Sequence, residues 1–270
     1  INNKGLEISL NADVIRTSKF QWTSDFNIGF NRNRVTELYG GKPELKGLKH
    51  LEEGRDMDEW YLREWAGVDP ANGSPLWYTT DENGKRTTTD SYNKADRVYC
   101  GSAAPKFTGG WMNSFSYKGF TLTANFDFVY GNLLYNQSRE LLDSDGAYAD
   151  YNSMKLKSGW KRWEKEGDIA THPKAINGGN KNSNKSSSRY LEKGNYFSLR
   201  NLSLGYSIPE KLCGKLGLQR VNVSCSADNL FTLTPFSGVS PQLSDSSTDG
   251  YAGTIYPLSR RIVFGLNVSF

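Results

Sequence analysis

Apolar and polar residues alternate along much of this chain of 270 residues. In the clearest stretch, 120–130, every even-numbered residue is apolar or aromatic, whereas the odd positions from 121 to 127 are Thr, Thr, Asn and Asp. Successive side chains of a β-strand point to opposite faces, so a period of two indicates a strand with one apolar and one polar face. Residues 120–130 are therefore predicted to form such a strand, with Asp127 on its polar face.

The same period recurs in other stretches, separated by turn-forming residues. A phase slip near Arg200 is typical of a β-bulge, in which one extra residue interrupts the pairing. Residues 60–68 and 76–78 are less regular, but the turn-forming segment 69–75 between them predicts a hairpin. About nine strands are predicted in total: 6–15, 20–30, 60–68, 76–78, 107–117, 120–130, 195–207, 221–228 and 261–270.

The last predicted strand carries a further signal. Its even positions are all apolar, and its final residue is aromatic. Chain ends usually fray in soluble proteins, whereas an unpaired strand edge is not tolerated in lipid. The pattern favours a strand that closes a membrane barrel. The residues expected to face lipid include Phe264, Leu266, Val268 and Phe270.

The predicted connections differ in length from one end of the strands to the other. If each strand reverses direction, all the short links share one end and all the long links share the other. Outer-membrane barrels have short periplasmic turns and long extracellular loops, and a soluble sandwich has no reason to sort its loops in this way. The short links are 16–19, 69–75, 117–119 and 208–217, and the long ones lie near 36–56, 81–105, 132–193 and 233–258.

Composition narrows the class of protein further. Hydrophobic residues make up 37% of the chain, the mean hydropathy is -0.63, and no run approaches the ~18 apolar residues of a membrane helix. Aromatic residues reach 13%, as both barrel girdles and sugar-binding surfaces require. The net charge is only +4 without a basic block, which argues against a nucleic-acid partner. The three cysteines form no spaced set for zinc or disulfides.

Nothing in the sequence marks an active site. The two histidines, His50 and His172, fall in predicted loops, and no nucleophile, phosphate-binding or metal-ligand motif accompanies them. Residues 143–146 (Asp-Ser-Asp-Gly) resemble the start of a calcium loop but lack its remaining spacing and its bidentate glutamate. We therefore expect no catalytic residue, no cofactor and no metal ion.

Aromatic residues in the longest loop are candidates for contact with a solute. Residues 154–166 are predicted to form a short helix that presents Trp160 and Trp163 on one face, because the two are three residues apart. Packing within the loop is the alternative role for each of these aromatics. The candidate contacts are Tyr148, Tyr151, Trp160 and Trp163 in the loop, together with Asp127 on the polar strand face.

Several separate motifs point to one family. They lie at 3–7 (Asn-Lys-Gly-Leu-Glu), 64–70 (Glu-Trp-Ala-Gly-Val-Asp-Pro), 199–209 (Leu-Arg-Asn-Leu-Ser-Leu-Gly-Tyr-Ser-Ile-Pro), 227–231 (Ala-Asp-Asn-Leu-Phe) and in the last strand. Together they resemble outer-membrane transporters of the SusC/RagA type, a branch of the TonB-dependent family. Residues 164–166 depart from this pattern, since the family usually has a proline there.

The resemblance implies an all-β fold, an antiparallel transmembrane β-barrel in the bacterial outer membrane. Residues 1–270 would be its C-terminal part, about nine of roughly 22 strands. The first residue is not Met, and we expect an N-terminal plug and the remaining strands to lie upstream. By the same resemblance, the TonB complex acts through that upstream segment and a SusD-like surface lipoprotein covers the extracellular mouth. The expected function is energised import of an oligosaccharide or a peptide, without catalysis.

Two other classes of protein remain open at this point. A soluble extracellular carbohydrate-binding β-sandwich would use the same alternation and the same aromatics, and a passive porin would share the barrel but lack the plug and the TonB-binding segment. A sandwich buries its apolar strand faces against a second sheet, whereas a barrel turns them to lipid. The surroundings of the apolar faces therefore discriminate between a sandwich and a barrel.

Overall fold

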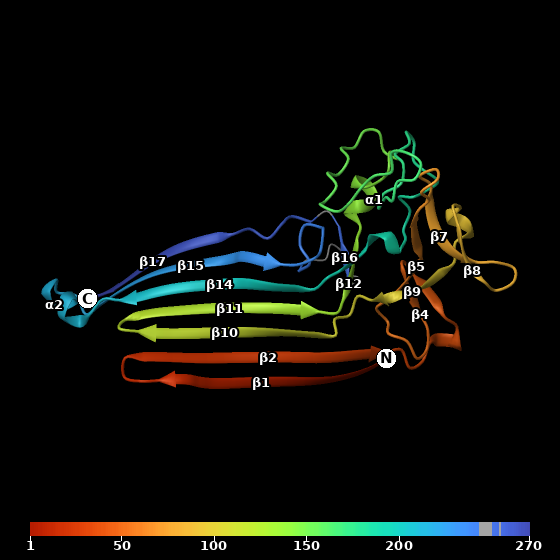
Figure 1. Cartoon of the computed structure of the whole chain (residues 1–270). Coiled ribbons are helices and arrows are strands. Elements are labelled where there is room, and N and C mark those ends of the chain that lie inside the picture. The colour runs from red at the N-terminus through yellow and green to blue at the C-terminus, as the bar shows by residue number, and fades with distance from the viewer. Residues whose placement is uncertain (243–249, 254) are drawn as a thin grey trace.

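The computed structural model describes residues 1–242, 250–253 and 255–270. It has two parts, a long sheet and a group of folded loops at one end of that sheet (Figure 1). We call these loops, which comprise 35–106, 131–195 and the described part of 234–260, the loop module.

Seven strands form the long sheet, in the order β1-β2-β10-β11-β14-β15-β17. Every neighbouring pair is antiparallel, so the predicted all-β antiparallel fold is confirmed. The strands are β1 (Asn2–Arg16), β2 (Phe20–Arg34), β10 (Phe107–Tyr117), β11 (Phe120–Tyr130), β14 (Tyr196–Ser207), β15 (Arg220–Leu233) and β17 (Arg261–Ser269).

The register places apolar residues opposite one another across the whole sheet. Trp111 of β10 lies between Phe26 of β2 and Phe126 of β11, and Leu204 of β14 lies between Leu122 and Cys225. Since side chains alternate between faces, this register builds one continuous apolar face. The predicted bulge is also present, because the pairing shifts between Leu199 and Asn201.

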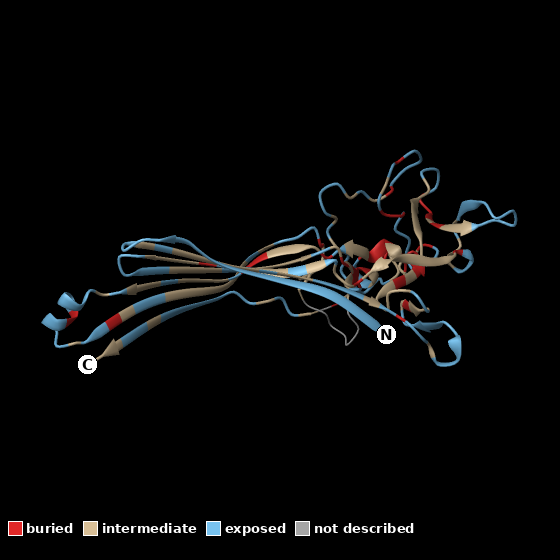
Figure 2. Cartoon of the chain, turned by 90° about the horizontal axis from the view of Figure 1, so that it is seen from below, coloured by how far each residue is buried: buried red, intermediate tan, exposed pale blue. Residues whose placement is uncertain are grey.

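The apolar face has no second layer packed on it among the described residues. The sheet is a single layer in Figures 1 and 2, and most of its apolar side chains are exposed or half-buried, with Leu10 at 60% and Leu266 at 70%. In a β-sandwich these residues would be buried between two sheets. The β-sandwich alternative is therefore wrong for the part of the chain that the structure covers.

Aromatic rings gather at both ends of the apolar face. At the end nearest the loop module, the ring of Phe107 lies 5.9 Å from Phe30 and 5.1 Å from Tyr130; we call these three residues the loop-end aromatic cluster. At the opposite end, the ring centroids of Phe120 and Tyr206 are 4.3 Å apart. The turn-end aromatic cluster consists of Phe20, Tyr117, Phe120 and Tyr206.

The opposite face of the sheet is polar and hydrogen-bonded across strands. Asn201 donates to Asp228 at 2.7 Å, and Asp228 accepts from Arg261 at 2.8 and 3.0 Å. These bonds join three neighbouring strands, β14, β15 and β17. The two faces of the sheet thus differ in chemistry along its whole width.

The connections between the seven strands sort by end, and more sharply than the sequence predicts. The short ones are 17–19, 118–119 and 208–219, where α2 (Glu210–Lys215) lies, and the long ones are 35–106, 131–195 and 234–260. Residues 243–249 and 254 of the predicted loop 233–258 lie outside the described residues. Figure 1 shows all three long connections meeting at one end.

The prediction of about nine strands in the sheet is corrected to seven. The hairpin predicted at 60–68 and 76–78 does not join the long sheet, and the link 69–75 lies at the long-loop end rather than at the short-turn end. The physical reason is burial. Trp60 and Trp77 are fully buried within the loop module, so these strands have no free apolar face to add to the long sheet.

Three small sheets build the loop module. They contain β3 (Glu44–Lys46), β4 (Lys49–Leu51), β5 (Glu59–Arg63) and β9 (Arg97–Ser102); β6 (Trp65–Val68), β7 (Pro75–Thr80) and β8 (Arg86–Thr89); and β12 (Leu133–Asn136), β13 (Leu191–Lys193) and β16 (Tyr251–Ala252). The module also holds α1 (Ser138–Leu142) and 3₁₀ turns at Tyr39–Gly41, Tyr92–Lys94 and Ser188–Tyr190. No helix in the described ranges has the length and apolar character needed to span a membrane.

The apolar core lies in the loop module, where Figure 2 shows most of the buried residues. Trp60 packs against Tyr135 and Tyr251 at centroid distances of 5.8 and 5.2 Å, and its indole Nε1 donates to the carbonyl of Leu133 at 2.9 Å. These partners come from all three long connections. The loops are consequently folded against one another as one packed body.

Candidate functional site in the loop module

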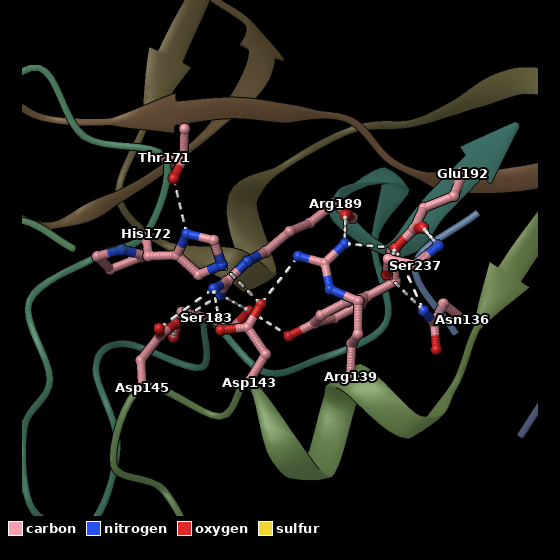
Figure 3. A network of polar contacts seen from close by, with 12 residues as sticks. Asn136, Arg139, Asp143, Asp145, Thr171, His172, Ser183, Arg189, Glu192 and Ser237 are labelled. Carbon is pink, nitrogen blue, oxygen red and sulfur yellow. Dashed lines mark hydrogen bonds and ion pairs between the residues drawn. The ribbon is translucent and has the colours of Figure 1, made fainter. Parts of the chain in front are cut away.

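A buried polar network lies within the loop module and is drawn in Figure 3. It is built around Asp143 and Asp145, whose side chains are fully buried. Asp143 follows directly on α1, and Asp145 with φ of 51° turns the chain sharply into Gly146 at φ of 89°. Asp and Gly tolerate this left-handed conformation better than most residues. The turn therefore directs two carboxylates from one short segment into the module.

Asp145 binds two arginines from distant parts of the loop. Its Oδ1 accepts from Arg162 at 2.6 Å and from Arg189 at 3.1 Å, and its Oδ2 accepts from Arg189 and from the Ser183 hydroxyl, the latter at 2.6 Å. Hydrogen bonds between ionised groups are among the strongest in proteins. Asp145 thus fixes three separate stretches of the connection 131–195 to one point.

Asp143 is held by Arg139 and His172. Arg139 Nη2 donates to its Oδ2 at 2.8 Å, and His172 Nε2 lies 3.0 Å from the same oxygen. Burial acts to raise the pKa of Asp143, but the hydrogen bond with His172 and the charges of Arg189 and Arg139 outweigh it and lower the pKa to about 2. The carboxylate is therefore ionised at neutral pH.

Glu192 extends the network to the third long connection. Its Oε1 accepts from Arg139 at 3.0 Å and from the Ser237 hydroxyl at 2.6 Å, and its Oε2 accepts from the Ser237 backbone N–H at 2.6 Å. Three carboxylates now face three guanidinium groups. Because a buried charge without a partner is costly, this balance indicates a structural clamp rather than a reactive site.

Trp163 is part of the packing of the loop. It is 8% exposed, and its indole Nε1 donates to the carbonyl of Pro70 at 2.9 Å. A Cβ atom on Gly73 would lie 2.5 Å from the Trp163 ring, so the two positions fit closely. Trp160 is half-buried, with its ring 4.5 Å from the Arg139 guanidinium and 5.0 Å from the His172 ring.

The predicted helix at 154–166 is wrong. The backbone of this segment forms hydrogen bonds across the loop instead. The Trp163 N–H donates to the His172 carbonyl at 3.0 Å, and the Thr171 N–H donates to the Lys161 carbonyl at 2.9 Å. Asp168 accepts from the side chain of Lys161 and from two backbone N–H groups, of Glu164 and Lys165, and these bonds lower its pKa to about 2. These contacts satisfy backbone groups that a helix would otherwise pair.

Tyr148 and Tyr151 lie at the surface of the module beside a hollow. They are 40% and 56% exposed, and their ring centroids are 5.4 Å apart. The hollow has a volume of ≈ 320 Å³ and is lined by Tyr148, Tyr151, Met154, Leu156, Asp145 and Arg162. Of the four predicted loop aromatics, the structure brings these two together at an accessible surface and places the two tryptophans in packing.

Asp127 lies away from this hollow, on the polar face of β11. Its Oδ2 accepts from the Tyr196 hydroxyl at 3.1 Å, and Arg200 Nε is 3.8 Å from its Oδ1. In the last strand, Phe264 and Leu266 lie on the apolar face at 79% and 70% exposure, and Phe270 follows β17 at 84%. Val268 is half-buried and pairs with Val221.

Sequence reasoning missed Arg139, Arg162, Arg189 and Glu192 as partners of the two aspartates. They are spread over the long connection, and no spacing rule joins them. The one available signal was the Asp-Ser-Asp-Gly run at 143–146, whose carboxylates bind guanidinium groups. Among the described residues no group of three or more His, Cys, Asp or Glu side chains is arranged to hold a metal ion.

Comparison with known proteins gives a consistent result along the chain. No family model matches it. The chain is 28% identical to TonB-dependent receptor P3 of Formosa agariphila and 22% identical to TonB-dependent receptor SusC of Bacteroides thetaiotaomicron, in both cases over 100% of this chain. The fold matches the structure of the RagAB peptide transporter with a TM-score of 0.84 and 26% identity over 99% of this chain.

Over its whole length the chain resembles TonB-dependent receptors of the SusC/RagA type. A second solved structure, the RagAB peptide importer in its closed-closed state, matches this chain with a TM-score of 0.82 and 27% identity. The chain spans 29% of the length of receptor P3 and 26% of SusC. The resemblance inferred from the sequence motifs is thereby confirmed.

Proposed function

We propose that this chain forms the C-terminal part of the wall of a bacterial outer-membrane barrel that imports a nutrient. One observation carries the proposal: a seven-stranded sheet with a continuous apolar face on which no second layer of described residues packs. Contact of such a face with the hydrocarbon of a lipid bilayer is favourable, whereas its contact with water is not. The relatives are TonB-dependent receptors and a RagAB importer, which supports import driven by TonB.

The spacing of the two aromatic clusters supports the location in a membrane. β10 has 11 residues, from Phe107 in the loop-end cluster to Tyr117 in the turn-end cluster. Ten steps of about 3.4 Å make about 34 Å along the strand, and a tilt of about 40° reduces this to roughly 26 Å across the membrane. Outer-membrane barrels carry an apolar band of about 25 Å between aromatic girdles.

Polar atoms on the apolar face are satisfied locally. The indole Nε1 of Trp22 donates to Asn113 at 3.0 Å, and that of Trp111 donates to Ser24 at 2.9 Å. In lipid no water is available to such groups, so each needs a partner in the protein. This arrangement supports lipid contact in the proposal.

The rest of the transporter follows from the same proposal. β1 and β17 each have one paired neighbour among the described strands, and open edges are not tolerated in lipid. An N-terminal segment of the same polypeptide would supply the plug, the remaining strands and the contact with the TonB complex. A SusD-like lipoprotein would cover the loop module on the cell surface.

The hollow beside Tyr148 and Tyr151 is the proposed place of solute contact. Two exposed rings offer stacking surfaces to an oligosaccharide or a peptide, and the partly exposed Arg162 lines the same hollow. RagAB, whose fold this chain shares, is a peptide transporter, so peptides are the first class to test. The polar face of the long sheet, which carries Asp127, would line the path of the solute through the barrel.

Replacing both Tyr148 and Tyr151 with Ala is expected to weaken uptake. Loss of two aromatic contacts of about 0.5–1.5 kcal/mol each predicts a rise in the KM for uptake of about tenfold, with an unchanged amount of protein in the outer membrane. Uptake of labelled peptide and oligosaccharide mixtures by cells with the full-length transporter measures this. An unchanged KM for every solute that is taken up would refute the assignment of the hollow.

The proposed function itself is tested by fractionation and by removal of TonB. We expect the full-length protein in the outer-membrane fraction, released by detergent but not by salt, and uptake that stops in cells without TonB. Release by salt would contradict the membrane location. Uptake that continues without TonB would identify a passive porin instead.

A further inference from the structure

Three cationic residues lie on the apolar face of β1 and β2. They are at the start of β1 and the end of β2, which Figure 1 shows beside the loop module. Lys4 is directly opposite Arg32, and Arg34 follows two residues later, opposite Asn2. Their parity is that of Leu6 and Phe30, so they share the face that we assign to lipid. All three are exposed.

This placement is unfavourable unless an anion is bound. Like charges directly opposite each other in a strand pair destabilise it, and no ion pair joins Lys4, Arg32 or Arg34 to a carboxylate within the described ranges. By contrast, Arg16 and Arg261 in the same sheet each pair with an aspartate. The cluster therefore has three positive charges, none of which forms an ion pair with a described carboxylate.

A hollow of ≈ 470 Å³ lies over the cluster, lined by Asn2, Lys4, Arg32, Arg34, Thr36 and Asp56. Asp56 is the one acidic residue in this lining, and its two oxygens already accept from the Ser102 hydroxyl and the Asp58 N–H, each at 2.8 Å. A second hollow of ≈ 900 Å³ shares Lys4 and Arg32 and is also lined by Leu6, Phe30 and Phe107. A cationic site thus adjoins an apolar one.

The depth of the cluster relative to the membrane follows from the strand. Arg32 is two residues beyond Phe30 of the loop-end aromatic cluster, which is about 7 Å along the strand. Residues just outside an aromatic girdle lie at the level of the lipid headgroups. One arginine guanidinium can bind two oxygens of a phosphate at once, and clusters of basic residues at a membrane surface bind anionic lipids.

We propose that Lys4, Arg32 and Arg34 bind the phosphate of an anionic outer-leaflet lipid, with its acyl chains along Leu6, Phe30 and Phe107. The inference rests on the proposed membrane location but not on any solute or on TonB. A free phosphate ion would match the cations but would leave the apolar part of the site empty. The lipid is therefore the ligand to which the site is assigned.

The test uses the full-length transporter in detergent and native mass spectrometry. The probes are a synthetic diphosphorylated lipid A, its fully dephosphorylated counterpart, and inorganic phosphate. We expect the phosphorylated lipid to bind the wild type at least about tenfold more tightly than the variant Lys4→Gln/Arg32→Gln/Arg34→Gln. The dephosphorylated lipid should bind both equally, and millimolar inorganic phosphate should not displace the phosphorylated lipid.

A matched control removes three positive charges at the other end of the sheet, in Lys19→Gln/Lys215→Gln/Arg220→Gln, all of which are exposed. This variant should bind the phosphorylated lipid like the wild type. Equal binding by the first triple variant, or equal loss in the control, overturns the proposal. Displacement by inorganic phosphate overturns the lipid assignment. If the lipid site is wrong, the full-length protein should still fractionate with the outer membrane and take up solute only with TonB. Failure of the lipid proposal is therefore distinguishable from failure of the proposed function.

Discussion

Asp145→Ala is expected to open the loop module while leaving the long sheet folded. The substitution removes the carboxylate that binds Arg162, Arg189 and the Ser183 hydroxyl. Two buried or half-buried guanidinium groups then lose a counter-charge, and breaking a buried pair in this way costs about 3–5 kcal/mol. Hydrogen exchange on the full-length transporter should show faster exchange across 139–190, with unchanged exchange in β10 and β11.

The matched control is Asp90→Ala. Asp90 forms an ion pair with Lys181, which belongs to the connection 131–195, but both side chains are about half exposed. Exposed ion pairs contribute about 0–1 kcal/mol, so exchange across 139–190 should change little. If Asp145→Ala and Asp90→Ala have the same small effect, the buried network is not what holds the loops together.

Ala124→Arg is expected to impair assembly of the barrel far more than Asn125→Arg. The two positions are adjacent on β11, near its middle, and point to opposite faces. An arginine at the membrane midplane on the lipid face costs about 2–4 kcal/mol, whereas substitutions facing the lumen are tolerated. Equilibrium unfolding of the refolded full-length barrel in lipid vesicles measures the difference in free energy.

The comparison between the two arginine variants is internally controlled, because strand, depth and introduced charge are the same. Ala124 pairs with Asn113 and Leu202, and Asn125 pairs with Met112 and Asn201. If Asn125→Arg destabilises the barrel as much as Ala124→Arg, or more, then the face that carries Ala124 is not the one in contact with hydrocarbon.

The long sheet was predictable because its chemistry repeats locally. In β11 and β17 the alternation extends along the whole strand, and each strand carries its own evidence of two different surroundings. The bulge near Arg200 was equally visible, as a slip in that alternation. These features require no knowledge of distant residues.

The loop module was not predictable in the same way. Trp60 and Trp77 have the sequence pattern of strand residues, and only their contacts in the folded module show that they are buried there. Trp60 packs against Tyr251 of another connection, and Trp77 packs against Trp65 of its own. Trp160 and Trp163 have helical spacing, yet the segment bonds to 171–172 instead. Such long-range contacts override local preference.

The buried network illustrates the same limit for the candidate site. Asp143 and Asp145 stood out as a short acidic motif, but their partners Arg139, Arg162 and Arg189 have ordinary neighbours in sequence. Which buried charges form pairs depends on which loops contact one another, and the packing of the apolar core determines those contacts. The exposed pair Tyr148 and Tyr151 was singled out as loop aromatics, and their contact with a solute remains a proposal.

In the proposed barrel, hydrocarbon touches the apolar face of the long sheet. Spin labels placed one at a time at positions 121–129 of the full-length transporter in lipid bilayers test this most directly. We expect collisions with oxygen, which concentrates in lipid, to be highest at even positions, and collisions with a water-soluble nickel complex to be highest at odd positions. Equal access of the nickel complex to both faces, or the opposite phase, would contradict it.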